Sequence, residues 1–373
     1  MPDVGPAEVE AVSKTLASGW LTSGPKVLEF ENSFAQRVGA KHALAVTSCT
    51  AALHLALDAI GVGQGDEVIV PTMTFTATAE AAMYLGAVPV LTDVCPKTGN
   101  MRVQDIEPKV GPRTKAIMAV HVGGIPCDLS AIHEFAATKN ITVIEDAAHA
   151  FPTKYRGKWI GSISDLTCFS FYATKTMTTG EGGMLTTSRD DLARRARMMR
   201  QHGIDRDAWN RDSSRQAWQY EVLESGFKYN MPDINAALGT VQLRRSDDMR
   251  KRRAEIAEIY FQELRNLRGI ELPPDVTSPD DQHSWHLFTI KVLPEAKHSR
   301  NDLSIKLRER KIGTSVHWIP LHLHPFYQRK FEAKAADFPN GTFLSDCILS
   351  LPISSKMTDR DVEDVVTNLK ALC

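Results

Sequence analysis

The sequence predicts an α/β protein with a large, mostly parallel sheet and a smaller α+β region towards its carboxyl end. Between about residues 40 and 190, short apolar runs alternate with helical patterns. The runs are apolar throughout, which is typical of parallel strands covered by helices on both faces. The pattern changes near residue 236, and 373 residues exceed the usual size of one core. We therefore expect two domains, residues 1–247 and 248–373.

Seven apolar runs in the first region predict strands. They are HALAVT (42–47), DEVIVP (66–71), VPVLTDV (88–94), TKAIMAVHV (114–122), ITVIEDA (141–147), LTCFSFY (166–172) and GGMLTT (182–187). The segments between them predict helices at 51–61, 76–86, 128–140 and 190–203. This order of strands and helices favours a doubly covered parallel sheet.

The remainder predicts a smaller α+β domain. Residues 234–267 read as one long helix or two consecutive helices. After them we expect strands at 284–293, 314–320 and 348–352, and helices at 301–313 and 358–373.

Composition argues against several classes of protein. The 44 basic and 45 acidic side chains leave no global field that would attract nucleic acid or an anionic membrane. The amino-terminal residues 1–12 lack the pattern of a signal peptide, and no apolar run is long enough to span a bilayer. The six cysteines show no C-x-x-C spacing, so we expect reduced thiols in a cytoplasmic protein.

An acid and a lysine follow two of the predicted strands. Glu145 and Asp146 close the VIED run, and Lys175 follows the LTCFSFY run just before a glycine-rich segment. Open α/β sheets bind ligands at the carboxyl ends of their strands, so these groups could share one site. Taken alone, each is also compatible with a solvated loop.

Two further features fit a ligand site at the same edge. Ser48 and Thr50 open a very apolar helix, whose first N–H groups and positive dipole end can bind an anion. An ordinary N-cap is the alternative. Phe75 follows another strand, where its ring could stack on an aromatic ligand or simply pack in the core.

Together these residues supply what pyridoxal 5′-phosphate (PLP) requires. They offer an amine for the aldehyde, an acid for the pyridine nitrogen, a phosphate cradle and a ring face. A buried carboxylate keeps the pyridine nitrogen protonated, so that the ring can accept electrons. A lysine with a depressed pKa can attack as the free amine and later shuttle a proton.

Several segments resemble the DegT/DnrJ/EryC1/StrS family of sugar aminotransferases. They occur in the family's order across nearly the whole chain: GWLTSGP, SCTAALHLAL, GDEVIVPTMTFTATAEAAMYLGAVPV, HVGGIPCDL, VIEDAAHAFPTKYRGKWIGSISD, FSFYATKTMTTGEGGML and GFKYNMPDINAALGTVQL. The resemblance implies a PLP-dependent transferase of fold type I that works as a homodimer with shared active sites.

The resemblance also implies a role for individual residues. Lys175 would form the Schiff base, Asp146 would pair with the pyridine nitrogen, and His149 would lie near the ring hydroxyl. The other implied cofactor contacts are Ala148 and Phe75 on the two ring faces, Thr50, Ala51 and Ser170 at the phosphate, and Asn230 at the phosphate of the other subunit's cofactor. Family members often carry glycine where this chain has Cys49. A loop that needed a positive φ there would be strained.

The same resemblance implies a nucleotide-linked keto sugar as amino acceptor and L-glutamate as donor, with the pyridoxamine form arising in turnover. His149 in EDAAHA is similar to members that aminate C4, in deoxyamino sugar biosynthesis. Amination at C3 or of a cyclitol ketone is the alternative. A dehydratase lacking the lysine, an aldolase or decarboxylase, and a non-catalytic regulatory protein are further rivals. Lys175 argues against the first, and Lys175 together with Asp146 argues against the last.

The carboxyl-terminal histidines are weaker candidates. His317, His322 and Tyr327 are expected near the sugar or diphosphate. His322 and His324 would share a face of a strand, but without a third placed ligand we expect no metal site. His283 and His286 are interpreted as strand-edge or domain-interface residues. A cluster of basic residues is interleaved with acids along one predicted helix, which favours a solvated helix. The cluster comprises Arg244, Arg245, Arg250, Lys251, Arg252 and Arg253.

Overall fold

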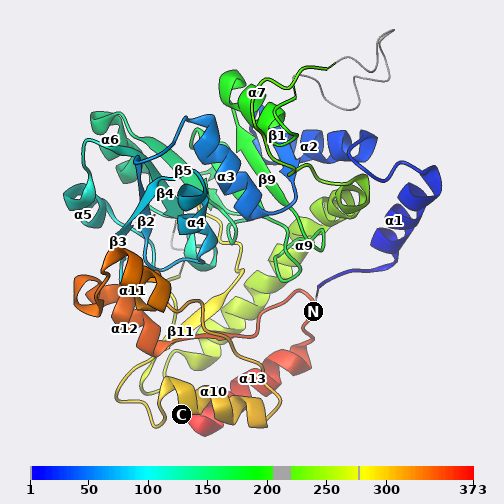
Figure 1. The fold of residues 1–373 in the computed structure, drawn as a ribbon. Helices are drawn as coiled ribbons and strands as arrows, with labels where there is room; N and C mark the ends of the chain where they lie inside the picture. The colour runs from blue at the N-terminus through cyan, green and yellow to red at the C-terminus, as the bar shows by residue number, and fades with distance from the viewer. Residues whose placement is uncertain (1, 205–219, 276–277) are drawn as a thin grey trace.

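The fold is built on a seven-stranded sheet (Figure 1). A computed structural model describes residues 2–204, 220–275 and 278–373. The strand order is β1-β9-β8-β5-β4-β2-β3, and β9 alone runs antiparallel to its neighbours. The strands are β1 (His42–Val46), β2 (Glu67–Pro71), β3 (Val88–Thr92), β4 (Thr114–Val120), β5 (Thr142–Asp146), β8 (Leu166–Ser170) and β9 (Gly183–Thr187). All seven predicted strands are confirmed, as is the mostly parallel sheet.

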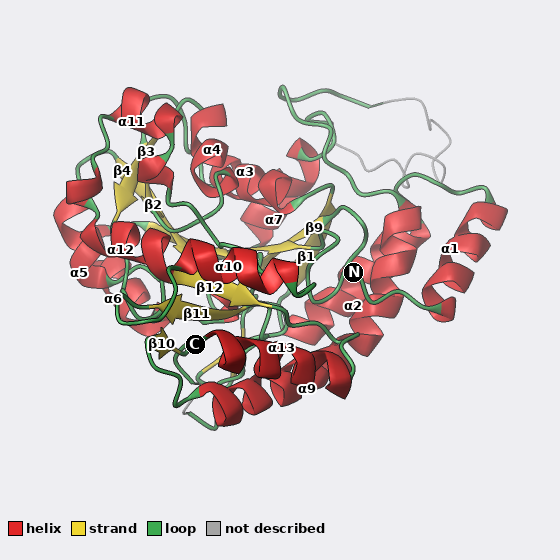
Figure 2. Cartoon of the chain, turned by 90° about the horizontal axis from the view of Figure 1, so that it is seen from below, coloured by secondary structure: helices red, strands yellow, loops and turns green. Residues whose placement is uncertain are grey.

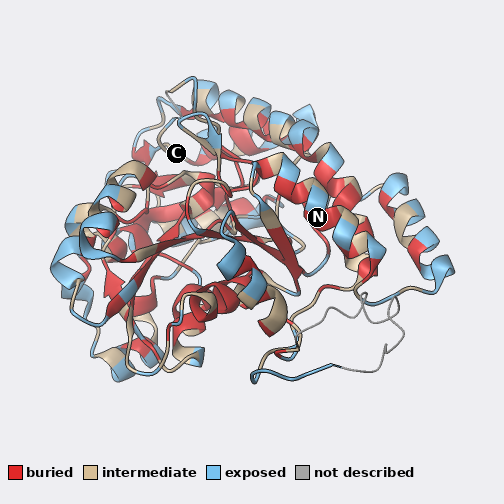
Figure 3. Cartoon of the chain, turned by 90° about the horizontal axis from the view of Figure 1, so that it is seen from above, coloured by how far each residue is buried: buried red, intermediate tan, exposed pale blue. Residues whose placement is uncertain are grey.

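Helices cover both faces of this sheet, as the apolar runs predict. Val68 and Val70 of β2 pack in one hydrophobic cluster, and Ile69 between them packs in the other. Figure 3 shows the sheet and the inner sides of the helices buried, with the outer helix faces exposed. The helices are α2 (Pro25–Val38), α3 (Cys49–Ala59), α4 (Ala77–Tyr84), α5 (Val103–Ile106), α6 (Leu129–Lys139) and α7 (Asp190–Met199).

The register of the parallel strands brings the candidate site together. Val120 at the end of β4 pairs with Asp146 at the end of β5. Asp146 in turn pairs with Cys168 of β8. The parallel strands β4, β5 and β8 therefore end at the same edge of the sheet, and the residues that follow them lie where the site is expected.

The amino-terminal helices were not predicted. They are α1 (Pro6–Ser18) and α2, which precede the first strand. On α2 the side chains of Val27, Phe30 and Phe34 are buried against the sheet. Their spacing of three and four residues is the helical signal that sequence inspection could have used.

One continuous helix, α9 (Asp233–Leu264), joins the large sheet to a second core (Figure 1). Ala236 belongs to the first core, whereas Ile256 and Tyr260 belong to the second. The expected domain boundary at 247/248 lies within this helix and stays a prediction.

The basic side chains of α9 do not all face solvent. Arg245 pairs with Asp3, and Arg252 pairs with Asp359. Arg253 is instead buried, which the solvated-helix interpretation did not predict.

The second core surrounds a small antiparallel sheet (Figure 2). Its elements are β10 (Ile270–Glu271), β11 (Phe288–Val292), β12 (Ile348–Leu351), α10 (Arg300–Glu309) and α13 (Asp359–Leu372). Further helices, α11 (Pro325–Phe331) and α12 (Pro339–Cys347), were not predicted, nor was the two-residue hairpin of β6 (Lys154–Tyr155) and β7 (Lys158–Trp159).

Two predicted strands differ from the structure. The strand expected over 284–293 begins only at Phe288, because Trp285 has a φ of 49° and leaves the extended region. The strand expected over 314–320 is wrong: a single bridge joins Ser315 to Ser350, and the chain then leaves the sheet. Within the described residues, no helix combines the length and apolarity that crossing a bilayer requires.

Candidate active site

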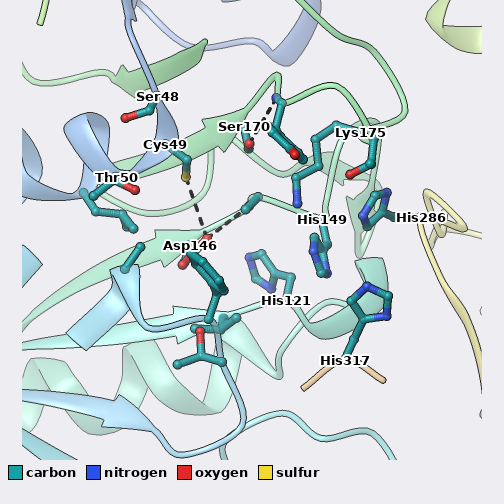
Figure 4. A pocket seen from close by; sticks show the side chains of 18 of the residues that line it. Ser48, Cys49, Thr50, His121, Asp146, His149, Ser170, Lys175, His286 and His317 are labelled. Atoms are coloured by element: carbon teal, nitrogen blue, oxygen red, sulfur yellow. Dashed lines mark hydrogen bonds between the residues drawn. The ribbon is translucent and has the colours of Figure 1, made fainter. Parts of the chain in front are cut away.

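A cavity of about 480 Å³ opens at the carboxyl edge of the large sheet, beside the first turn of α3. Most residues proposed from the sequence line it: Thr50, Phe75, Asp146, Ala148, His149, Ser170, Lys175 and His317. Figure 4 shows six of them around the cavity, namely Thr50, Asp146, His149, Ser170, Lys175 and His317. These residues come from segments more than 250 positions apart in the chain, so only the fold brings them together. Phe75 is 59% exposed, which leaves its ring available to a ligand rather than packed in the core.

Asp146 is a buried carboxylate with donors on both oxygens. Oδ1 accepts a hydrogen bond of 3.1 Å from the Ala148 backbone N–H. Oδ2 accepts one of 2.8 Å from the hydroxyl of Thr78. Burial raises the pKa of Asp146, while Thr78, the Ala148 N–H and Lys175 act in the opposite direction. A cation placed against this carboxylate would favour its charged form further.

Lys175 has an amine that is easy to deprotonate. Burial lowers the pKa of Lys175 to about 8, although nearby Cys49 and Asp146 oppose the shift. The fraction of this amine that is neutral and nucleophilic near neutral pH is therefore much larger than for an ordinary lysine. Lys175 and Asp146 thus face one cavity with the amine and the carboxylate that the sequence predicted.

His149 presents a defined tautomer to the cavity. Its Nδ1 accepts a hydrogen bond of 3.3 Å from the Gly123 N–H, so the neutral ring carries its proton on Nε2. Burial lowers the pKa of His149 well below its usual value. The ring stacks on Trp318 with centroids 4.9 Å apart. His149 is therefore a neutral donor in a fixed orientation.

The first turn of α3 lies against β9 because Gly183 lacks a side chain. A Cβ on Gly183 would lie 2.5 Å from the backbone carbon of Ser48. Ser48 caps the helix through an Oγ that accepts from the Ala51 N–H at 3.1 Å. Cys49 opens the helix without a positive φ, so the strain considered for this position is absent. The N–H groups of Cys49 and Thr50 remain for an anion.

Four predicted residues are not brought to the cavity wall. Ala51 is buried and its N–H donates to Ser48 Oγ. Asn230 does not line the cavity either, and its Nδ2 donates to Ser23 Oγ at 2.7 Å. His322 lies in a short 3₁₀ turn, not a strand, and its ring nitrogens contact the hydroxyls of Thr72 and Thr342. Tyr327 is buried.

Several residues that line the cavity were not predicted from the sequence. His121 directly follows β4, so the rule that found Asp146 at the end of β5 could also have found it. His286 and Trp318 also line the cavity, and no local pattern announced either of them. His286 is not a strand-edge residue, because β11 begins two positions later.

Glu145, the other acid of the VIED run, points to the opposite face of β5 from Asp146. It accepts from His121 Nε2 at 2.9 Å and from the Ser164 N–H and Thr167 hydroxyl. Burial would raise the pKa of Glu145, but these donors hold it below its usual value. Glu145 thus anchors His121 rather than serving a ligand directly. No cluster of His, Cys, Asp and Glu suited to a metal ion occurs in the described part of the chain.

The donor set fits PLP. An amine and a buried carboxylate face each other, a neutral imidazole N–H points to the same space, and a helix amino terminus closes one side. Together with the seven-stranded sheet, this defines the class of protein as a PLP-dependent transferase of fold type I.

The chain belongs to the DegT/DnrJ/EryC1/StrS aminotransferase family, whose model matches residues 2–370. It is 49% identical over 368 residues to the spore coat polysaccharide biosynthesis protein SpsC of Bacillus subtilis, covering 98% of this chain and 94% of SpsC. It is therefore a PLP-dependent enzyme that transfers an amino group to a sugar.

Solved structures agree with this assignment. Spr1654 of Streptococcus pneumoniae in its PMP form superposes with a TM-score of 0.94 at 31% identity, covering 100% of this chain and 97% of that one. The same protein has also been solved in a PLP form. S. venezuelae DesV, in complex with a ketimine intermediate, gives a TM-score of 0.88 at 33% identity, covering 98% of this chain and 93% of DesV.

Proposed function

We propose that this enzyme moves an amino group from L-glutamate to C4 of a nucleotide-linked keto sugar, with Lys175 and Asp146 as its principal catalytic groups. The observation that carries the proposal is one cavity in which an amine of pKa about 8 and a buried carboxylate lie together. The segment EDAAHA, with its His149, supports the choice of C4, because this wording resembles that of family members that aminate C4.

PLP, when bound, supplies an aldehyde for amines and a ring that accepts an electron pair. Lys175 would hold the aldehyde through its amine, with loss of water, and its free amine would move a proton at the reacting carbon of the substrate. Asp146 would keep a proton on the ring nitrogen through its carboxylate. His149 would donate its Nε2 proton towards the ring oxygen, and the turn at Cys49 and Thr50, with Ser170, would receive the phosphate.

The proposed acceptor needs cations that one protomer does not provide. Among the cavity residues that the structure describes, Lys175 is the only lysine or arginine, and the pKa values of His149, His286 and His317 are lowered chiefly by burial. His121 also lines the cavity, and its pKa is raised to about 10, but its Nε2 is already paired with Glu145. Beyond Lys175, a diphosphate and the two carboxylates of glutamate would therefore meet no unpaired positive charge among these residues. This supports a homodimer whose partner completes each site.

Asn230 supports the same arrangement. Its side chain bonds Ser23 and receives a hydrogen bond from Lys228, outside the cavity of its own protomer. In the proposed dimer Asn230 reaches the phosphate in the partner's site, so that a monomer is inactive.

The test has two stages. The purified holoenzyme is first mixed with glutamate alone, and the PLP absorbance band should convert to that of the pyridoxamine form. The pyridoxamine form is then offered a panel of 4-keto and 3-keto nucleotide sugars and a cyclitol ketone, with products identified by mass spectrometry and NMR. Recovery of the PLP band only with 4-keto nucleotide sugars is the expected result. Failure of every common amino donor, or recovery only with 3-keto or cyclitol substrates, would contradict the proposal.

A further inference from the structure

Two buried polar atoms beside Lys175 have no partner among the described residues. They are Nδ1 of His286 and the hydroxyl oxygen of Thr176. Both residues line a small void of about 10 Å³, which Lys175 also lines. Buried polar groups are normally hydrogen-bonded, so each such exception calls for an explanation. The void is at the lower limit of the space that a water molecule needs.

The backbone around His286 is held in an unusual conformation. Trp285 has a φ of 49°, which is rare for an aromatic residue and costs free energy. Nη1 of the buried Arg253 donates to the carbonyl oxygens of Trp285 and His286 at 3.2 and 3.4 Å. These bonds fix the segment that carries the imidazole.

A second set of contacts fixes the same segment to the cavity wall. The hydroxyl of Ser284 donates to the carbonyl oxygen of His149 at 2.7 Å. Gly124, at a φ of 101°, makes room for it, since a Cβ there would lie 2.0 Å from Ser284 Oγ. The ring centroids of His149 and His286 lie 4.2 Å apart. Figure 4 shows both rings beside the side chain of Lys175.

We propose that His286 is a positioning residue whose Nδ1, unpartnered in this structure, accepts a hydrogen bond from the ε-amine of Lys175 once the released lysine side chain turns towards the small void. The hydroxyl oxygen of Thr176 is the second acceptor of the same amine. This inference rests on the proposed role of Lys175 and does not depend on which sugar is aminated.

The chemistry of amino transfer requires such a place. While the amino group resides on the cofactor, the Lys175 amine is free and buried, and its N–H groups need acceptors. Nδ1 of His149 cannot serve, because it already accepts from Gly123. Burial lowers the pKa of His286 well below its usual value, so its ring is neutral and can accept. The amine thus waits within the cavity instead of turning to solvent.

The test measures the pKa of Lys175 in the apoprotein. Competitive labelling with acetic anhydride over a pH series, followed by mass spectrometry of the Lys175 peptide, gives this value without any turnover. The groups that face Lys175 are Cys49 and Asp146, which raise its pKa, and the neutral His149 and His317. None of these is altered in the variants below.

His286→Phe keeps a ring for packing but removes the acceptor. His286→Asn loses the ring but places a carbonyl oxygen near the position of Nδ1. Loss of a hydrogen bond to the charged amine should lower the pKa of Lys175 by about one pH unit in His286→Phe. In His286→Asn the pKa should stay near the wild-type value. Thr176→Val should lower it by a smaller amount, and it carries the test if His286→Phe does not fold.

A kinetic readout accompanies the labelling. In a single turnover, conversion of the pyridoxamine form to the PLP form should slow about tenfold in His286→Phe and should return to near the wild-type rate in His286→Asn. In the steady state, kcat should change more than KM. His283→Phe is the matched control, because His283 stacks on Trp285 in the same segment but lies outside the cavity.

The inference is overturned if His286→Phe and Thr176→Val keep the wild-type pKa of Lys175, or if His283→Phe lowers it equally. It is also overturned if His286→Asn is as slow as His286→Phe, because the defect would then come from loss of the ring and not from loss of the acceptor. A failure of the proposed function would look different, since borohydride would then trap PLP at another residue or nowhere.

Discussion

The hydroxyl of Thr78 donates to Oδ2 of Asp146 at 2.8 Å, and Thr74 Oγ1 lies 2.7 Å from that same hydroxyl. All three residues are buried. The carboxylate that would meet the cofactor's ring nitrogen is therefore oriented by a short chain of hydroxyl groups from the loop before α4 and its first turn.

Thr78→Val should weaken this orientation without changing side-chain volume. Because the buried carboxylate of Asp146 loses one hydrogen-bond donor, the free energy of unfolding should fall by about 1–2 kcal/mol. We expect the glutamate half-reaction to slow about tenfold, measured by stopped-flow absorbance. Thr78→Ser keeps the donor and should retain most of the rate. Equal rates in Thr78→Val and the wild type would show that the hydroxyl does not act through Asp146.

Asp146→Asn should still bind PLP but should slow the half-reaction by about 10²- to 10³-fold. The amide is neutral and cannot stabilise a protonated ring nitrogen. The measurement is a single-turnover trace with glutamate, after cofactor content has been checked by absorbance. A wild-type rate in the fully loaded variant would refute the pairing with the ring nitrogen.

The capture of PLP by the apoprotein should depend on pH through Lys175. The folded pKa is about 8, whereas the unfolded value is near 10.5, so burial favours the neutral amine. The rate of capture, followed by absorbance, should rise with pH and level off above a midpoint near 8. A midpoint near 10.5 would mean that the amine is not buried as described.

The same shift has a consequence for stability. Between pH 8 and 10.5 the unfolded chain binds more protons at Lys175 than the folded chain, so stability rises with pH across this window. Relative to Lys175→Met, the apoprotein should therefore gain about 2–3 kcal/mol there. Denaturant titrations at the two pH values measure the difference, and parallel curves for both proteins would contradict it.

Shared sites can be tested by mixing two inactive variants. In a dimer formed from Lys175→Ala and Asn230→Ala protomers, one site carries both changes and the other carries neither. After unfolding and random reassociation, about a quarter of wild-type activity should return. No recovery, when Asn230→Ala alone is impaired, would place Asn230 in its own protomer's site.

Much of the large sheet was predictable from the sequence, because buried parallel strands are apolar throughout and need no partner to be recognised. Asp146 and Lys175 were predictable for a related reason: each follows such a strand, and the ends of parallel strands meet. His286 was not predictable, since its place depends on Trp285 and Arg253, which lie in segments joined only by the fold. The strand expected at 314–320 failed similarly. Only Ser315 forms a backbone bridge to the small sheet, and His317 and Trp318 line the cavity instead.

The central claim is that Lys175 bonds the PLP aldehyde within reach of Asp146. Reduction of the holoenzyme with borohydride, followed by peptide mass spectrometry, tests this most directly. We expect the phosphopyridoxyl group on the peptide containing Lys175, and no trapping in Lys175→Ala that still folds. A label on another lysine, or a holoenzyme that borohydride leaves unchanged, would contradict the account.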